Sequence, residues 1–173
     1  MATQTSRYAL ADYQITVTVP SSENNAAVNA ILQRAGIVSG TTITIGGPGE
    51  GEGKWGSYLG SISVKRNKDL WSTDGDATGS WVHNKNLDRT GSIDVEITQV
   101  SKQITQLVYL CSAFESVSDA VEGLHLEIKN TASGLNIVDA IDCYIAKIPD
   151  HPFQDAAQKL TFSFTCGRIT YYN

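Results

Sequence analysis

The sequence is poor in cysteine, poor in basic residues and without a long apolar run. Its 173 residues include three cysteines, an odd number with no C-x-x-C spacing: Cys111, Cys143 and Cys166. All three fall at apolar positions, which predicts reduced core thiols in a protein made in the cytosol rather than a disulfide framework. No apolar stretch approaches the ~18 residues of a membrane span. Because the polar N-terminus also lacks a signal-peptide core, we expect a soluble protein that no signal peptide exports.

Basic residues are outnumbered by acidic ones. The chain has 13 Lys and Arg against 18 Asp and Glu, which leaves a formal net charge of −5. Proteins that grip nucleic acid do so with clustered Lys and Arg, so the composition argues against tight or specific nucleic-acid binding. The length is that of a single domain, 1–173, which can bury a sizeable core.

A glycine-rich stretch contains a literal G-x-G-x-x-G, formed by Gly51, Gly53 and Gly56. A dinucleotide site needs a strand before this motif and a helix after it. Here an alternating, strand-like segment follows, and the carboxylates of Glu50 and Glu52 would repel a pyrophosphate. The segment 46–56 is therefore predicted to be a mobile loop that binds no cofactor.

Metal-binding and catalytic patterns are incomplete. Asp74, Asp76, Thr78 and Gly79 match the first half of a calcium loop, but position twelve is Lys85, where a bidentate Glu is required. The histidines are separated from one another and from cysteine partners: His83, His125 and His151. No serine, cysteine or threonine lies in the context of an activated nucleophile. The sequence thus predicts no enzyme, no metal and no small-molecule ligand.

The segment 88–131 has the clearest pattern of secondary structure. Ile93, Val95 and Ile97 alternate with polar residues as in a half-buried strand, and a second alternating strand starts at Leu124. Between these strands, Ser101 offers an N-cap to a helix. The helix has one apolar face, which is predicted to pack on the sheet: Ile104, Leu107, Val108, Cys111 and Phe114.

The rest of the chain is predicted to form strands, loops and one optional helix. Further strands are expected at 13–19, 41–45, 57–66, 138–148 and 160–166, the last with a possible extension over 169–172. Residues 1–11 form a loose arm, a turn at Asp74-Gly75 belongs to a hairpin region, and a short helix is possible within 22–35. About eight strands and one firm helix predict an α+β domain dominated by antiparallel sheet.

Tryptophan allows two interpretations. Trp55, Trp71 and Trp81 gather in the glycine-rich and hairpin-rich third of the chain, although a tryptophan ordinarily belongs to a core. Trp55 lies in a loop too rich in glycine to form a core, so docking onto a partner explains it better. These three residues and Tyr8 are the candidates for contacts between subunits.

The C-terminal half resembles the tail tube proteins of tailed bacteriophages, especially those with contractile tails. The segment 84–101, NKNLDRTGSIDVEITQVS, is similar to the family's Asp-Arg-Ser/Thr-Gly turn and following strand. The helix at 102–119 and the strand and turn at 124–134, LHLEIKNTASG, follow in the expected places. CYIAKIPD at 143–150 and LTFSFTC at 160–166 resemble the last two strands of the family. The order and spacing of these segments carry the resemblance, because no single one is specific.

This resemblance implies a β-sandwich or barrel-like domain with one flanking helix. It also implies six-fold rings, stacked into a hollow tube that conducts DNA from capsid to host without binding it specifically. The implied partners are further copies of the chain, the tail sheath, the baseplate hub, the tape-measure protein and the terminator. Such a protein would be made and assembled in the bacterial cytoplasm and would end in the tail of the virion.

The outward row of the strand at 93–97 is the candidate wall of the channel: Ser92, Asp94, Glu96 and Thr98. A mildly acidic wall would not hold the phosphates of DNA. Alternation fixes two faces of a strand but not which face lines a lumen, so the outside of the tube or the sheath contact is the alternative.

Two other functions stay open at this stage. The chain could be a β-sandwich module that binds glycans or a host surface through its tryptophans, or a baseplate or hub protein with the same fold. A tube subunit forms rings or tubes, whereas a glycan-binding module stays monomeric and binds sugar.

Overall fold

The computed structural model describes residues 8–20, 25–34, 42–47, 59–117 and 122–172. Most of the predicted glycine-rich loop, with Trp55, and most of the predicted N-terminal arm lie outside these ranges. The elements are a 3-10 turn at Leu10–Asp12, β1 Tyr13–Thr18, α1 Ala26–Arg34, β2 Thr42–Gly46, β3 Leu59–Arg66, β4 Trp71–Gly75, β5 Trp81–Lys85, β6 Gly91–Thr98, α2 Lys102–Ser116, β7 Leu124–Asn130, β8 Leu135–Ile145 and β9 Lys159–Tyr171.

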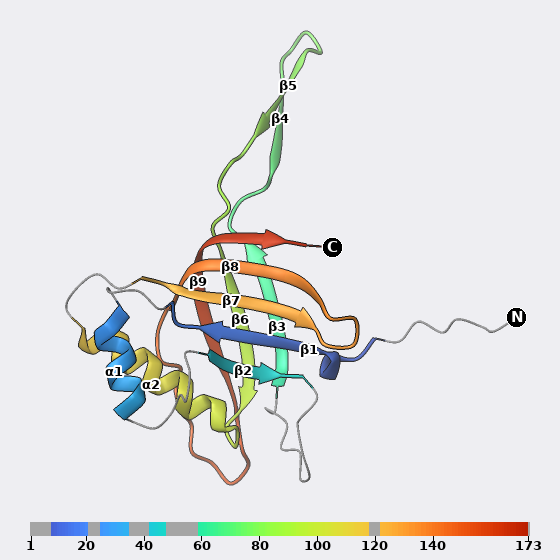
Figure 1. Ribbon diagram of the computed structural model, residues 1–173. Helices are drawn as coiled ribbons and strands as arrows, with labels where there is room; N and C mark the ends of the chain where they lie inside the picture. The colour runs from blue at the N-terminus through green and yellow to red at the C-terminus, as the bar shows by residue number, and fades with distance from the viewer. Residues whose placement is uncertain (1–7, 21–24, 35–41, 48–58, 118–121, 173) are drawn as a thin grey trace, which may run out of the picture.

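Seven strands form one antiparallel sheet in the order β2-β1-β7-β8-β9-β6-β3. The sheet curls, so that β3 and β6 run across the direction of β1, β2, β7 and β8 (Figure 1). The long strand β9 pairs with β6 through its first half and with β8 through its second half, and so joins the two parts. The predicted antiparallel α+β fold is confirmed, with the core inside the curl of a single sheet.

The core follows from the alternation in the strands. Ile93, Val95 and Ile97 on β6 are fully buried, and Phe162 and Phe164 on β9 lie opposite Val95 and Ile93. Cross-strand pairs of this kind on one face of a sheet stabilise it. The hydrophobic side chains of β6 therefore point inward, and its polar row points outward.

Helix α2 packs beside β2 and adds its apolar face to the core. Its N-cap is Ser101, whose Oγ accepts a hydrogen bond from the Gln103 N–H at 3.3 Å. Of the predicted apolar face, Ile104, Leu107 and Cys111 are buried, whereas Val108 and Phe114 are half-buried at its edge. The centre of the buried face includes two further residues, Leu110 and Ala113.

A second helix, α1, lies within 22–35, where the sequence allows a short helix, so two helices and not one flank the sheet. α1 packs against α2 and buries Val28 and Leu32. The preceding Asn25 is fully buried: its Nδ2 donates to the Pro20 carbonyl at 3.0 Å, and its Oδ1 accepts from the Glu122 N–H at 2.9 Å. Asn25 thus ties the start of α1 to the residues that follow β1 and precede β7.

The hairpin turn also differs from the prediction. Asp74 and Gly75 belong to strand β4, and the chain turns at Asp76–Gly79. The Oδ1 of Asp76 accepts from the Thr78 N–H at 2.8 Å and the Ser80 N–H at 2.9 Å. A side chain that bonds its own backbone two residues on sets the turn, a role that a dipeptide pattern does not reveal.

Candidate functional site

The β4–β5 hairpin projects away from the curled sheet (Figure 1). Every residue of its two strands is exposed. An isolated two-stranded hairpin is marginally stable in water, so this one depends on its base and on any surface that it contacts.

The two faces of the hairpin differ in chemistry. Trp71 pairs with Lys85, and Trp81 pairs with Gly75, so the alternation places both tryptophans on one face. The tryptophans are 54% and 66% exposed, and the Lys85 Nζ lies 5.6 Å from the centre of the Trp71 ring. At this distance an ammonium group and an aromatic ring attract each other weakly when both are exposed to solvent. We call these two tryptophans with Lys85 the tryptophan face.

The opposite face of the hairpin is mainly polar. Asp74 and Val82 are register partners there, and the Asn84 Nδ2 donates to the Asp74 Oδ2 at 2.7 Å. Large exposed aromatic side chains are enriched where proteins contact one another. The tryptophan face, and not this polar face, is therefore the candidate contact surface.

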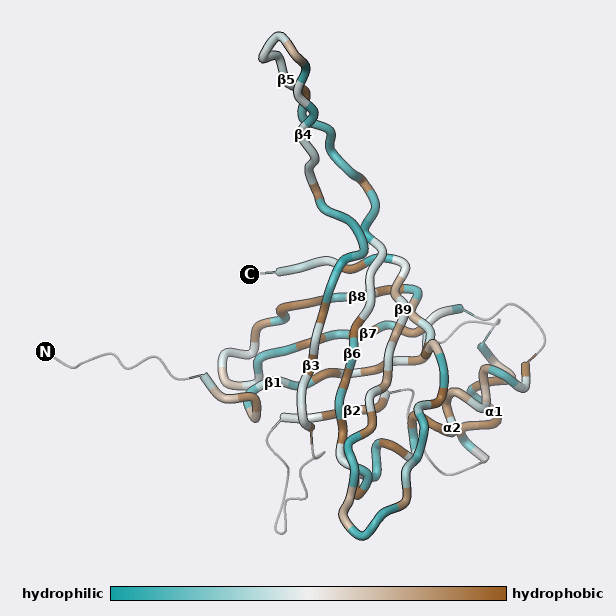
Figure 2. The backbone as a smooth tube through the Cα atoms, turned by 180° about the vertical axis from the view of Figure 1, so that it is seen from behind, coloured by the Kyte–Doolittle hydropathy of each residue, from teal (hydrophilic) through white to brown (hydrophobic). Residues whose placement is uncertain are grey.

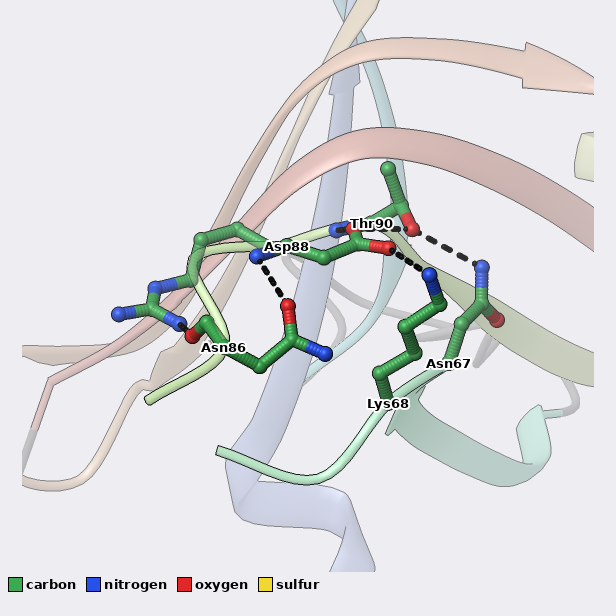
Figure 3. A network of polar contacts seen from close by, with 6 residues as sticks. Asn67, Lys68, Asn86, Asp88 and Thr90 are labelled. Atoms are coloured by element: carbon green, nitrogen blue, oxygen red, sulfur yellow. Dashed lines mark hydrogen bonds and ion pairs between the residues drawn. The ribbon is translucent and has the colours of Figure 1, made fainter. Parts of the chain in front are cut away.

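A network of polar contacts holds the base of the hairpin (Figure 3). The Asp88 Oδ1 accepts from the Thr90 N–H at 2.9 Å and the Thr90 hydroxyl at 2.6 Å, and Lys68 pairs with the Asp88 Oδ2 at 3.5 Å. Asn67 Nδ2 donates to the Thr90 Oγ1 at 3.1 Å, and the Asp88 N–H donates to the Asn86 Oδ1 at 2.9 Å. These contacts tie the two chain segments that lead into and out of the hairpin.

The same network lowers the pKa of the Asp88 carboxyl. The largest cause is the hydrogen bond from the Thr90 hydroxyl, followed by the bond from its N–H and, more weakly, by Lys68. The residue after this turn must be glycine, because a Cβ on Gly91 would lie 2.2 Å from the Lys65 carbonyl oxygen. The Asp-Arg-Thr-Gly segment thus fixes the direction in which the hairpin leaves the sheet.

The outward row of β6 lies in the middle of a hydroxyl-rich surface. Its four residues, the candidates for the channel wall, are half-buried: Ser92, Asp94, Glu96 and Thr98. Their register partners on β3 and β9 include Ser61, Ser63, Lys65, Lys159, Thr161, Ser163 and Thr165. The Lys159 Nζ lies 3.5 Å from the Glu96 Oε1. Lys65 and Lys159 lie beside the two carboxylates. This surface is therefore balanced in charge, whereas the residues of β6 alone suggest an acidic one.

An apolar groove lies at the other end of β6 from the hairpin. β6 starts at Gly91, beside the hairpin base, and ends at Thr98, beside Lys159, roughly 23 Å away at about 3.3 Å per residue. The groove has a volume of about 460 Å³ and lies between α2 and the segment 146–158. Its lining includes Val100, Tyr109 and Phe153, which are 57%, 48% and 89% exposed.

Gln99 holds the segment 146–158 against the end of β6. Its Nε2 donates to the Pro152 carbonyl at 2.6 Å, and its Oε1 accepts from the Gln158 N–H at 2.9 Å. Sequence reasoning missed this groove because it forms where Ile104 and Val108 of the helix meet Val100 and Phe153, which belong to no periodic segment. The hydropathy colouring in Figure 2 shows the mixed character of the loop and of the start of α2 at this end.

Tyr8 lies apart from the tryptophan face. It is 78% exposed, its ring centre lies 5.5 Å from that of Tyr13, and it lines a second groove of about 220 Å³ with Ile62 and Val64 of β3. β3 and β2 are the two outer strands of the main sheet. Trp55, the remaining candidate contact residue, is outside the described residues.

Metal ligands do not gather in the part of the chain that the structure describes: no group of three or more His, Cys, Asp or Glu side chains could hold an ion there. Among the helices in the described ranges, none is both long and apolar enough to cross a membrane.

Comparison with known proteins decides the family. The family model described as "Bacteriophage PhiTE tail tube protein" matches residues 36–172, most of the chain. The chain belongs to this family of phage tail tube proteins. It is therefore a structural component of a phage tail.

The fold of this family member is similar to that of solved chains from contractile injection systems. It matches a chain of the sheath/tube terminator of the extracellular contractile injection system PVC, with 8% identity, a TM-score of 0.50, and coverage of 98% of this chain and 99% of that one. A chain of the anti-feeding prophage tube terminating cap gives 11% identity and a TM-score of 0.48, covering 98% and 93%. The PVC sheath-tube complex in its extended state gives 10% and 0.46, covering 94% and 90%. No curated protein sequence matches this tail tube family member.

Proposed function

We propose that this protein self-assembles into stacked hexameric rings that form the inner tube of a contractile phage tail. The observation that carries the proposal is the placement of the tryptophan face and the apolar groove at opposite ends of β6. A surface at one end that fits a different surface at the other end makes a head-to-tail contact. Such contacts do not close between two subunits and can extend without limit.

In this arrangement the hairpin of one subunit docks into the groove of a subunit in the next ring. The tryptophan face supplies two large aromatic side chains, and the groove offers Val100, Tyr109 and Phe153, which are exposed in the single chain. Burial of an aromatic side chain in an apolar pocket at the centre of an interface is the usual source of binding energy between proteins. Trp55 and Tyr8 are proposed to contribute further contacts between subunits.

Within a ring, the outer strands β2 and β3 are proposed to meet neighbouring subunits. Unpaired strand edges invite pairing with another chain, and closure of a ring removes them. Tyr8 lies beside the β3 edge, at the groove shared with Ile62 and Val64. The sheet order, with β2 and β3 at its two ends, supports this contact.

The lumen is proposed to be lined by Ser92, Asp94, Glu96 and Thr98, with the hydroxyls of β3 and β9 beside them. Because Lys65 and Lys159 balance Asp94 and Glu96, the surface offers phosphate no excess of positive charge. Each uncompensated basic contact would add a counterion-release term that holds DNA. A balanced surface of short polar side chains lets DNA pass without specific binding.

The proposal includes the setting of the protein. It is made and assembled in the cytoplasm of the host bacterium and works in the virion, where it contacts the sheath, the baseplate hub, the tape-measure protein and the terminator. It has no catalytic role and takes no cofactor or small-molecule ligand. A baseplate, hub or terminator protein is the alternative with the same fold.

The tryptophan face also favours a second candidate, a module that binds glycans or a host surface. The rings of Trp71 and Trp81 are 54% and 66% exposed, which leaves them free to stack on sugars. This candidate predicts a monomer that binds carbohydrate, and no dependence on the groove at the opposite end.

Negative-stain electron microscopy of the purified chain, with sedimentation at increasing concentration, separates these functions. We expect rings or tubes, alone or after addition of a tail initiator complex. A species that stays at the 18.6 kDa of one chain under all these conditions would contradict the tube proposal. Short rings that bind only the end of preformed tubes would favour the terminator or hub role.

A further inference from the structure

Cys143 on β8 and Cys166 on β9 lie directly opposite each other in the sheet. Both side chains point into the core, with exposures of 0% and 4%. Register partners on the same face of an antiparallel pair have Cβ atoms about 4.5–5.5 Å apart. The two thiols are therefore neighbours, and the Cys166 thiol donates to the Phe164 carbonyl at 3.8 Å.

The hydrogen-bond pattern around them defines the type of pair. The Ala146 N–H donates to the Ser163 carbonyl at 2.9 Å, which makes those two residues a hydrogen-bonded pair. Hydrogen-bonded and non-hydrogen-bonded pairs alternate along an antiparallel ladder. The register continues without a shift to Cys143 and Cys166, three residues away. They are thus a non-hydrogen-bonded pair, in which the Cα atoms approach to about 4.5 Å. A disulfide accepts Cα separations of roughly 4.4–6.8 Å, so the spacing of such a pair lies within the range that a disulfide can bridge.

The ladder is interrupted beside this pair. Asp142 has a left-handed backbone with φ 55°, and the register between β8 and β9 has no pair at Asp142 and Gly167. Both of these residues are exposed. Cys166, one residue from this break, is the member of the pair with residual exposure, 4% against 0% for Cys143.

We propose that Cys143 and Cys166 are a modification site, at which a peroxide closes an intrachain disulfide between β8 and β9. This inference does not depend on the tube proposal. The chain emerges reduced, and the bond forms where the surroundings are oxidising.

The reaction balances with hydrogen peroxide as the oxidant. The Cys166 thiolate attacks one peroxide oxygen, the O–O bond breaks, and the leaving hydroxide takes a proton to become water, which leaves a sulfenic acid. The Cys143 sulfur then attacks the sulfenic sulfur; the S–S bond forms, the S–O bond breaks, and hydroxide leaves as water with the Cys143 proton. Two thiols are oxidised, and one peroxide is reduced to two waters.

The polarity of the pair agrees with these roles. The hydrogen bond from Cys143 lowers the pKa of the Cys166 thiol, whereas the same contact and burial raise the pKa of Cys143. Cys166 is therefore the sulfur that attacks the oxidant, and Cys143 is the resolving sulfur. Cys111 on α2 is not opposite either of them and stays a free thiol.

Intact mass measurement of the full chain tests the site. The protein is treated with hydrogen peroxide, denatured and alkylated with N-ethylmaleimide, beside a sample that is not oxidised. We expect the alkyl groups per chain to fall from three to one, with a peptide that links Cys143 to Cys166. The oxidised chain should also unfold at higher urea concentration, and a thiol reductant should reverse both changes.

Variants define the partners. Cys111→Ser should keep the cross-link, whereas Cys143→Ala and Cys166→Ala should abolish it. If these two variants fail to fold, the mass of the oxidised wild-type chain still decides whether the cross-link forms. Refolding in air from denaturant serves as a second route to the bond. Three alkylated thiols after both treatments, or sulfinic acid at Cys166 in place of the link, would overturn the proposal.

Discussion

The Oδ1 atom of Asp88 accepts hydrogen bonds from both the N–H and the hydroxyl of Thr90, at 2.9 and 2.6 Å. This local turn stands where the chain returns from the hairpin to the sheet. With Lys68 and Asn67 from the outgoing segment, it connects the two legs of the hairpin base. This carboxylate adds to the backbone bonds from Asn67 to Thr90 and from Asn86 to Leu70 in holding the tryptophan face relative to the sheet.

Replacement of that carboxylate should loosen the hairpin while the core stays folded. In Asp88→Ala, the Thr90 donors and Lys68 lose their shared acceptor, so amide protons of β4 and β5 should exchange faster with deuterium. Exchange in β6, β7 and β9 should be unchanged. Asp69→Ala, at an exposed acid in the same region, is the matched control and should leave exchange in the hairpin as in the wild type.

The hairpin should also loosen in acid. The pKa values of Asp88 and Asp76 in the folded protein lie below their ordinary value of 3.8, because Thr78, Ser80 and Thr90 donate to their carboxylates. A lowered folded pKa gives stability that is present above the ordinary value and is lost as pH falls through the folded value. Tryptophan fluorescence and hairpin amide exchange should therefore change as pH falls below about 3.8. In Asp88→Asn this change should shrink; an unaltered titration would show that Asp88 does not hold the base.

The tryptophan face should matter for assembly and little for folding. Trp81→Ala removes a side chain that is 66% exposed, so urea unfolding of the single chain should be nearly unchanged while tube formation falls at least tenfold. Val82→Ala, on the opposite face of the same hairpin, should assemble normally. Phe153→Ala should reproduce the Trp81→Ala defect if the groove receives the hairpin. A large loss of stability in Trp81→Ala would instead make Trp81 part of the fold.

The buried face of α2 should contribute strongly to stability. Leu107 is fully buried against the core, so Leu107→Ala should lower the free energy of unfolding by roughly 2–5 kcal/mol, through lost burial and the cavity that remains. Thr105→Ala, at an exposed position of the same helix, should change it by less than about 0.5 kcal/mol. Chemical denaturation measures both, and a cost near zero for Leu107→Ala would mean that α2 is loosely attached.

Charge reversal can locate the lumen. Asp94→Lys with Glu96→Lys turns the balanced surface of β3, β6 and β9 positive, which should slow DNA ejection and lower infectivity while tubes still form. Glu127→Lys with Asp139→Lys makes the same charge change on register partners of β7 and β8, on the other part of the sheet. Normal ejection from the first variant and slow ejection from the second would assign the channel to the β7–β8 surface.

The strands were predictable because their alternation has a strict period. Ile93, Val95 and Ile97 point to the core in the structure as the pattern required, and a half-buried strand has few other ways to satisfy such a pattern. The order of strands in the sheet was not predictable in the same way. It pairs β1 with β7 and β9 with β6, contacts between segments far apart in the chain that no local pattern encodes.

The candidate surfaces were only partly visible in the sequence. Residue type alone points to Trp71 and Trp81, but their common face follows from the register of β4 and β5. The dipeptide pattern also predicts the turn at Asp74, two residues before its true start. The sequence of β6 alone predicts an acidic surface. It does not reveal Lys159, which lies 61 residues after its register partner Thr98. Tertiary neighbours, rather than the strand itself, set the electrostatics of a sheet face.

The separation of the tryptophan face and the groove along β6 has a consequence for how long a tube can be. If each added ring covers one groove layer and presents an identical fresh layer, the growing end after many rings is chemically the same as the end after one ring. Nothing in the subunit then registers how many copies have been added. The length would have to be measured by another molecule, and the subunit would supply only the repeat distance.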